Sequence, residues 1–224
     1  MSKIEWNKVG NRFYETGVSK AVLYPQVSGA YPKGVAWDGV TGVTESPSGA
    51  EPTALWAGNI KHAVMMSTEE YAATIEAYMS PKEFDACDGS AEITPGVTIG
   101  QQTRQAFGFS YVTNVGNDTD GLEHAYKLHI VYGCMASPSE RGHSTINESP
   151  EAETLSWEVS TTPVEVPGYK PTATFTFDSR TTDASKLAAI EAVLYGSEDT
   201  DARLPLPAEL FTLLGVTTDD GAEG

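Results

Sequence analysis

The alternation of hydrophobic and polar residues along the chain predicts a protein built mainly from β-strands. Between residues 105 and 115 the odd positions are mostly aromatic or apolar, and the even positions are mostly small or polar. Between residues 126 and 132 the apolar side chains fall on the even positions. The stretch from Gly116 to Gly121, GNDTDG, has the composition of a turn. The two segments therefore predict an antiparallel hairpin.

Two later segments alternate in the same way and predict strands with one packed face and one hydrophilic face. The hydrophilic face of the first comprises Ser156, Glu158 and Ser160. The hydrophilic face of the second comprises Thr172, Thr174, Thr176 and Asp178. Segments at 18–24, 35–43 and 54–66 also have strand composition. The expected fold class is mainly β, with antiparallel sheets.

Residues 42–52, GVTESPSGAEP, are interpreted differently, because they contain only residues typical of turns and linkers. A loop of about ten residues without regular structure is unusual inside a compact domain and tends to be functional or mobile. The sequence therefore predicts a long, functional loop at this position.

Two segments predict amphipathic helices that cover a sheet face or edge. Residues 67–81 begin with a capping-box pattern and carry apolar residues at helical spacing, namely Tyr71, Ile75, Tyr78 and Met79. The second helix is expected over residues 184–195, capped by Asp183 and ended by Gly196.

The length of 224 residues allows one large domain or two small ones. We expect a single domain over residues 1–215, followed by a disordered acidic C-terminal tail over 216–224. The chain has 31 acidic and 14 basic residues, a formal net charge of −17. This balance argues against nucleic-acid binding, because that affinity comes mostly from Lys and Arg. It also argues against docking on an anionic membrane. The N-terminus lacks a signal-peptide pattern, which predicts folding in a cytosol.

No residue pattern predicts catalysis, a cofactor or a metal site. The four histidines are scattered, and His129 with Lys127 is interpreted as a solvated pair on one strand face. No serine or cysteine lies in a nucleophile elbow, and no carboxylate pair is singled out by its spacing. Residues 199–201 lack the glycine and the terminal glutamate of a calcium loop. Cys87 and Cys134 are expected to be reduced, partly buried thiols.

Several stretches of the chain together resemble the major tail proteins of long-tailed, non-contractile bacteriophages. FYETGVSKAVLYP at 13–25 resembles the opening strand of that family, and SWEVSTTPVEVPGYKPTATFTFDSR at 156–180 resembles its paired C-terminal strands. TTDASKLAAIEAVLYGSEDTDARLPLPAEL at 181–210 is similar to its terminal helix, YG stop and LPLP segment. The resemblance covers most of the chain and lies in the order of the segments, not in any catalytic motif.

The resemblance implies an antiparallel β-sandwich or barrel with one or two packed helices and long loop or terminal arms. In this family six subunits form a ring, their inward sheets join into one barrel, and stacked rings form the tail tube that conducts DNA into the host. The implied partners are further copies of the chain, a tape-measure protein in the lumen, and the distal tail and tail-terminator proteins. DNA would pass without specific binding, and the protein would reside in the virion tail after assembly in the host cytoplasm.

Candidate site residues follow from this comparison. The hydrophilic strand faces supply the candidate lumen-facing residues Ser156, Glu158, Ser160, Thr172, Thr174 and Thr176. The loop at 42–52 supplies the candidate inter-ring residues Thr44, Glu45, Ser46, Ser48 and Glu51. The alternative is a β-sandwich carbohydrate-binding or adhesion module on a virion or cell surface. That module would need clustered exposed aromatic residues, whereas the tryptophans are scattered at Trp6, Trp37, Trp56 and Trp157.

Overall fold

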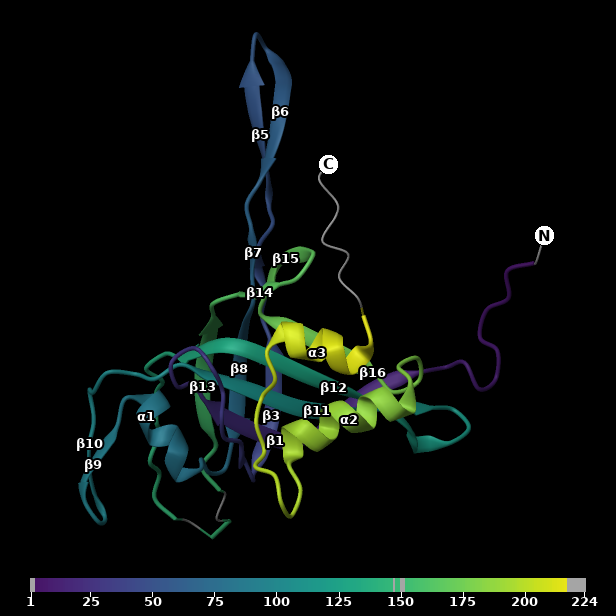
Figure 1. Cartoon of the computed structure of the whole chain (residues 1–224). Helices are drawn as coiled ribbons and strands as arrows, with labels where there is room; N and C mark the ends of the chain where they lie inside the picture. The colour runs from purple at the N-terminus through teal and green to yellow at the C-terminus, as the bar shows by residue number, and fades with distance from the viewer. Residues whose placement is uncertain (1–2, 147, 150–151, 217–224) are drawn as a thin grey trace.

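The computed structural model describes residues 3–146, 148–149 and 152–216. One antiparallel sheet is formed by β1 Tyr14–Pro25, β2 Val35–Ala36, β3 Val40–Glu45, β8 Ala72–Ala77, β11 Phe107–Asn117, β12 Gly121–Ala136, β13 Leu155–Thr161 and β16 Thr174–Asp178. Their order is β2–β1–β11–β12–β13–β8–β3, and β16 also pairs with β12 (Figure 1). The fold is therefore mainly β and antiparallel, as the alternation predicts.

Further short strands form two-stranded pairs outside this sheet. They are β4 Ser48–Gly49 with β7 Glu69–Glu70, β5 Pro52–Ala57 with β6 Ile60–Met66, β9 Ala91–Thr94 with β10 Val97–Ile99, and β14 Val164–Val166 with β15 Tyr169–Thr172. The helical segments are η1 Lys82–Phe84, α1 Asp85–Asp88, α2 Ala184–Tyr195 and α3 Pro207–Leu214. Figure 1 shows α2 and α3 packed on the same side of the sheet.

The long strand β12 carries two neighbours along one edge. Residues 127–131 pair with β16, and residues 134–136 pair with β13. Between them lies Gly133, with φ of +60°, where an added Cβ would collide with the carbonyl oxygen of Thr162. Only glycine fits this position without strain. The strand thus changes partner at Gly133, which lets one sheet enclose a core.

The two faces of β11 and β12 pack against two different hydrophobic cores. On one face, Phe107, Phe109 and Val131 join Trp37 and Trp157 from other strands and loops. On the other face, a second cluster includes Val112, Leu128, Ile130 and Tyr132 from the strands and Leu187, Ile190 and Leu194 from α2. Sequence alternation predicts one hydrophilic face for these strands. That prediction is wrong for β11 and β12, because α2 and α3 cover the second face.

Helix α2 matches its sequence prediction in position and in caps. The carboxylate of Asp183 accepts hydrogen bonds from the backbone N–H groups of Ser185 and Lys186, and the helix ends at Gly196. The hydroxyl of Tyr24 on β1 donates to the carbonyl of Leu194, 2.9 Å away, and ties the helix to the sheet. Helix α3 begins at Pro207, the last residue of the LPLP segment, and the sequence patterns predict no helix there.

The helix predicted over residues 67–81 is wrong. The structure forms β7 and β8 there, and β8 lies between β3 and β13. Ala73, Ile75 and Ala77 are buried while the residues between them are more exposed, which is a two-residue period. The i, i+4 spacing of Tyr71 and Ile75 fits both a helix and a strand. Pairing with two neighbouring strands decides between them.

Candidate functional site

A long two-stranded ribbon, residues 42–76, rises from the sheet and projects far beyond the body of the molecule (Figure 1). One leg contains β3, β4 and β5, and the other contains β6, β7 and β8. The same register runs through the pairs Gly42 with Glu76, Ser48 with Glu70, Pro52 with Met66, and Leu55 with Ala63. The three strand pairs are therefore one continuous hairpin with irregular points, which we call the ribbon.

The turn at the tip of the ribbon has a local cause in the sequence. Gly58 and Asn59 connect β5 to β6, and both have positive φ, +59° and +64°. Two central residues with positive φ are the requirement of the type I′ turn that suits the twist of a hairpin. Glycine and asparagine are the residues that adopt this conformation at least cost. The pair Gly58-Asn59 thus fixes the end of the ribbon.

Large apolar side chains are exposed on the outer part of the ribbon, over β5 and β6. Trp56 is 69% exposed, Ile60 66% and Met66 68%. Leu55 and Met65 lie on one face, whereas Val64 and Met66 lie on the other, because directly paired residues share a face. The outer ribbon is therefore apolar on both faces, unlike a strand pair that lies on its own core.

The charge of the ribbon changes between its outer part and its base. Residues 52–66 contain Lys61 and His62 and no carboxylate. Nearer the body, Glu51, Glu69 and Glu70 flank the two legs. The outer ribbon thus carries no acidic residue, although the net charge of the chain is −17.

Hydrogen bonds hold the base of the ribbon to the sheet. The hydroxyl of Tyr111 on β11 donates to the carboxylate of Glu45, the last residue of β3, at 2.7 Å. The hydroxyl of Thr161 on β13 donates to the carbonyl of Tyr71 at 2.7 Å, and the N–H of Ser46 donates to the carbonyl of Ala72. Both legs are therefore fixed where they leave the body.

A polar cluster lies beside this base, in a cavity of about 390 Å³. The ring of His129 stacks on the ring of Tyr111, and its Nε2 lies 2.9 Å from the hydroxyl of Thr113. Lys127 donates to Glu15 at 2.5 Å. Burial lowers the pKa of His129, although the nearby carboxylates of Glu45 and Glu15 oppose this effect. His129 is only 9% exposed, so its interpretation as a solvated surface residue is wrong.

The candidate inter-ring residues all lie in the leg that contains β3, β4 and β5, in the part of that leg nearest the body. Glu45 and Thr44 belong to β3, and Ser48 belongs to β4 and pairs with Glu70. Ser46 and Glu51 lie in the short breaks between these strands. The expectation of a structureless loop over residues 42–52 is wrong, because cross-strand pairing orders this segment. The outermost apolar residues of the ribbon lie further along the chain, at 54–66.

The candidate lumen residues fall on two different surfaces. Ser160 pairs with Met135, and it lies with Ser156 and Glu158 on the outer face of β13, away from the first core. Thr176 pairs with His129, so Thr176 and Thr174 lie on the opposite face, toward the polar cluster. Thr172 pairs with Val164 at the open end of the β14–β15 hairpin. The structure does not bring these residues onto one continuous sheet face.

The tryptophans divide into two buried and two exposed residues. Trp37 and Trp157 pack in the first core with 5.4 Å between ring centroids. Trp6 and Trp56 are exposed, on the N-terminal arm and on the ribbon respectively. The sequence did reveal a sign of the ribbon, namely Gly58-Asn59 between two apolar runs. The prediction of one strand segment over residues 54–66 misses this turn, because the strand composition continues on both sides of it.

The described residues contain no group of three or more histidine, cysteine, aspartate or glutamate side chains that could hold a metal ion. Cys87 and Cys134 are free and buried, and burial raises the pKa of both thiols. None of the helices in the described part of the chain is long and apolar enough to cross a membrane. Comparison of the sequence with models of protein families and with curated proteins gives no match.

Proposed function

We propose that this chain is a self-assembling structural subunit of a phage tail tube. Six copies form a ring, and the rings stack through the ribbon into a hollow tube that conducts DNA during ejection. The resemblance in the order of sequence segments and the mainly β, antiparallel fold support this proposal.

The observation that carries the proposal is the ribbon with apolar side chains on both of its faces. An isolated two-stranded hairpin is marginally stable in water, and apolar patches on such a projection are typical of interaction surfaces. Leu55 and Met65 on one face and Val64 and Met66 on the other can both be covered when the ribbon enters a neighbouring ring. Assembly would therefore bury these side chains, which are exposed in the single subunit.

Strand edges and charge are also consistent with a tube. Within the described residues β16 pairs only with β12, so its other edge is free to continue the sheet into a neighbouring copy. The net charge of −17 disfavours adhesion of DNA phosphates to the tube. A tape-measure protein in the lumen and distal tail and tail-terminator proteins at the tube ends would complete the assembly. The carbohydrate-binding alternative gains no support, because the exposed Trp6 and Trp56 lie on separate projections.

Two matched variants test the role of the ribbon. Ile60 on the ribbon is 66% exposed and Ile93 on the β9–β10 hairpin is 63% exposed, so aspartate at either position adds the same charge at nearly the same solvent exposure. We expect Ile60→Asp to abolish tube formation, measured by sedimentation, while Ile93→Asp retains it. Tubes formed equally by both variants would contradict the role of the ribbon.

A further inference from the structure

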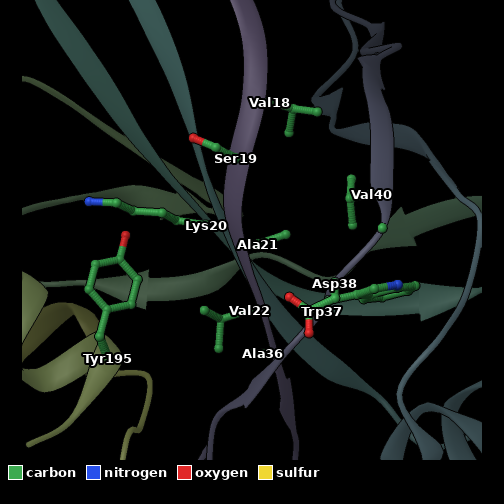
Figure 2. A pocket seen from close by; sticks show the side chains of 11 residues that line it. Val18, Ser19, Lys20, Ala21, Val22, Ala36, Trp37, Asp38, Val40 and Tyr195 are labelled. Atoms are coloured by element: carbon green, nitrogen blue, oxygen red, sulfur yellow. The ribbon is translucent and has the colours of Figure 1, made fainter.

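The strand that begins the ribbon has one edge without strand pairing. Within the described residues β3 pairs with β8 and with no other strand, so the edge that faces β1 is free. Figure 2 shows Val18 on β1 and Val40 on β3 facing each other across a groove of about 550 Å³. The polar cavity of about 390 Å³ also lies between these strands, and Glu15 from β1 and Glu45 from β3 line it. The first strand of the ribbon therefore has room to move relative to β1.

One hydrogen bond fastens β3 across this cavity. The hydroxyl of Tyr111 donates to the carboxylate of Glu45 at 2.7 Å, and the ring of Tyr111 stacks on His129. Tyr111 thus joins the ribbon base, which we define as residues 42–46 and 71–76, to the interior of the sheet. A displacement of the His129 ring would also displace the Tyr111 ring that reaches Glu45.

The closed ribbon base leaves a buried hydroxyl without a partner. Tyr71 lies close to Glu45 and Tyr111, but its hydroxyl makes no well-formed hydrogen bond among the described residues. An unpaired buried hydroxyl lowers stability because it has lost its hydrogen bonds to water. Opening of the base relieves this cost, so a second unfavourable change in the cluster can shift the balance toward the open state.

The hydrogen bonds of the cluster determine where a proton can be added to His129. The hydroxyl of Thr113 donates to Glu15 at 2.6 Å, so its oxygen accepts from Nε2 of His129, 2.9 Å away. The neutral ring therefore carries its hydrogen on Nε2, and acid adds a proton to Nδ1. This Nδ1 atom lies 3.4 Å from the hydroxyl of Thr176. The added proton thus faces a neutral group at the long end of hydrogen-bond distances.

The charged groups that face His129 lie on β1, β3 and β12. The carboxylates of Glu45 and Glu15 attract a charged ring, whereas Lys127 repels it. Lys127 also donates to Glu15 at 2.5 Å and so offsets part of that attraction. Burial outweighs these attractions and lowers the pKa of His129, so the closed cluster disfavours the charged ring. A neighbouring ion pair, opposite Lys127 in register, is formed by Asp178 and Arg180.

We propose that Tyr111, His129 and Glu45 form a pH-sensitive latch, which holds the ribbon base closed while His129 is neutral and releases it when His129 is protonated. Once Glu45 and the Tyr111 ring have moved, water can reach the charged ring. Acid favours this open state because the open state binds the proton more readily than the closed one. The latch concerns the regulation of the ribbon, and it rests on the proposed function only for its effect on assembly.

Hydrogen–deuterium exchange of the dilute full-length protein at pH 7.5 and 5.5 tests the latch. Histidine ordinarily titrates within this window, whereas carboxyl groups ordinarily titrate near pH 4. One proton changes an equilibrium by at most roughly tenfold per pH unit. After correction for the intrinsic effect of pH on exchange, we expect protection of the ribbon base to fall roughly three- to tenfold relative to α2. Equal changes in the ribbon base and in α2 would overturn the latch, because they would indicate global unfolding.

Two variants separate the parts of the latch. His129→Gln can still hydrogen-bond to Thr113 and does not titrate, so the pH-dependent loss of protection should disappear. Tyr111→Phe keeps a ring beside His129 and removes the donor to Glu45, so the ribbon base should lose protection roughly tenfold or more already at pH 7.5. His143→Gln is the matched control, since the side chain of His143 is 79% exposed. Retained pH dependence in His129→Gln, or full protection in Tyr111→Phe, would overturn the proposal.

Assembly gives a separate readout. If the chain forms tubes, the natural protein should form fewer at pH 5.5 than at pH 7.5, and His129→Gln should form them equally at both. A latch that opens in the exchange measurement without tubes at either pH would support the latch and contradict the proposed function. Tubes at pH 7.5 from a protein whose ribbon base is insensitive to pH would do the reverse. The exchange comparison within the natural protein decides even where a variant fails to fold.

Discussion

Tyr111 and His129 lie opposite each other on β11 and β12 with their rings stacked, 4.6 Å between centroids and 8° between planes. The hydroxyl of Tyr111 also holds Glu45 at the base of the ribbon. The stacked pair therefore connects the interior of the sheet to the segment that projects from it. Because His129 titrates, this stacked pair predicts a pH dependence of the stability of the folded chain.

The stability of the folded chain is expected to fall as pH drops below the ordinary His pKa of 6.5, in part through His129. Burial lowers the pKa of His129, so the unfolded chain binds this proton more readily than the folded chain. The neutral ring of His129 contributes fully to the free energy of unfolding above pH 6.5. This contribution is lost as the pH falls toward the lower pKa that His129 has in the folded chain. Urea unfolding from pH 7.5 to 5 measures it.

His129→Gln should flatten this pH dependence, because glutamine can hydrogen-bond to the hydroxyl of Thr113 and does not titrate. His143→Gln is the control, since the side chain of His143 is 79% exposed. If His129→Gln kept the full pH dependence of the natural protein, another group would be responsible.

Helix α2 is expected to be stabilised mainly by its buried stripe. Ile190 is fully buried between the helix and the second core, so Ile190→Ala should lower the free energy of unfolding by about 2–5 kcal/mol. Denaturant titration measures the loss. Ile93→Ala, at an exposed position, should change it by less than about 0.5 kcal/mol. Similar values for the two variants would contradict the packing of α2.

Removal of the ribbon tip should separate folding from assembly. Replacing residues 54–64 with Gly-Asn keeps Thr53 paired with Met65 and restores a two-residue turn. The body retains both cores, so its thermal unfolding should stay near that of the natural protein. The expected product is a folded subunit that forms no tubes, which circular dichroism and sedimentation establish together. Tubes of normal length from this variant would contradict the proposed function of the ribbon.

A deletion in one leg should act differently. Removing Ser46–Ala50 takes five residues from one strand of the ribbon and none from the other. Because the side-chain period of a strand is two, an odd shift exchanges the faces of the whole outer leg. We expect faster proteolysis of the ribbon, measured with limited trypsin digestion at Lys61. Unchanged cleavage at Lys61 relative to the natural protein would argue against the continuous register.

The sequence predicted the strands whose side chains alternate most clearly, and helix α2 with both of its caps. It failed at β8, where Ile75 belongs to a pattern that fits either a helix or a strand. It also failed at His129, which shares a strand face with Lys127 and is nevertheless buried. Both errors have one physical cause, because contacts with distant segments leave no signal in the local sequence. Strand β8 is fixed by its pairing with β3 and β13, and His129 is covered by Tyr111.

The segment predicted as an inter-ring loop lies in the same hairpin as the exposed apolar residues of the outer ribbon, and the roles of its residues stay a prediction. Thr44 to Glu51 have loop composition, yet the strand residues among them pair in register with residues twenty or more positions later. The local sequence cannot show this, because the partner strand supplies the hydrogen bonds. The tail predicted over 216–224 lies outside the described residues, apart from Val216. The single domain over 1–215 stays a prediction.

The central claim is that copies of this chain assemble through the ribbon into a tube. Electron microscopy of the purified full-length protein at increasing concentration tests it most directly. The account predicts hollow stacked rings with sixfold symmetry, with the ribbon of each ring inserted into the next. A monomer at every concentration, with no rings or tubes, would contradict it.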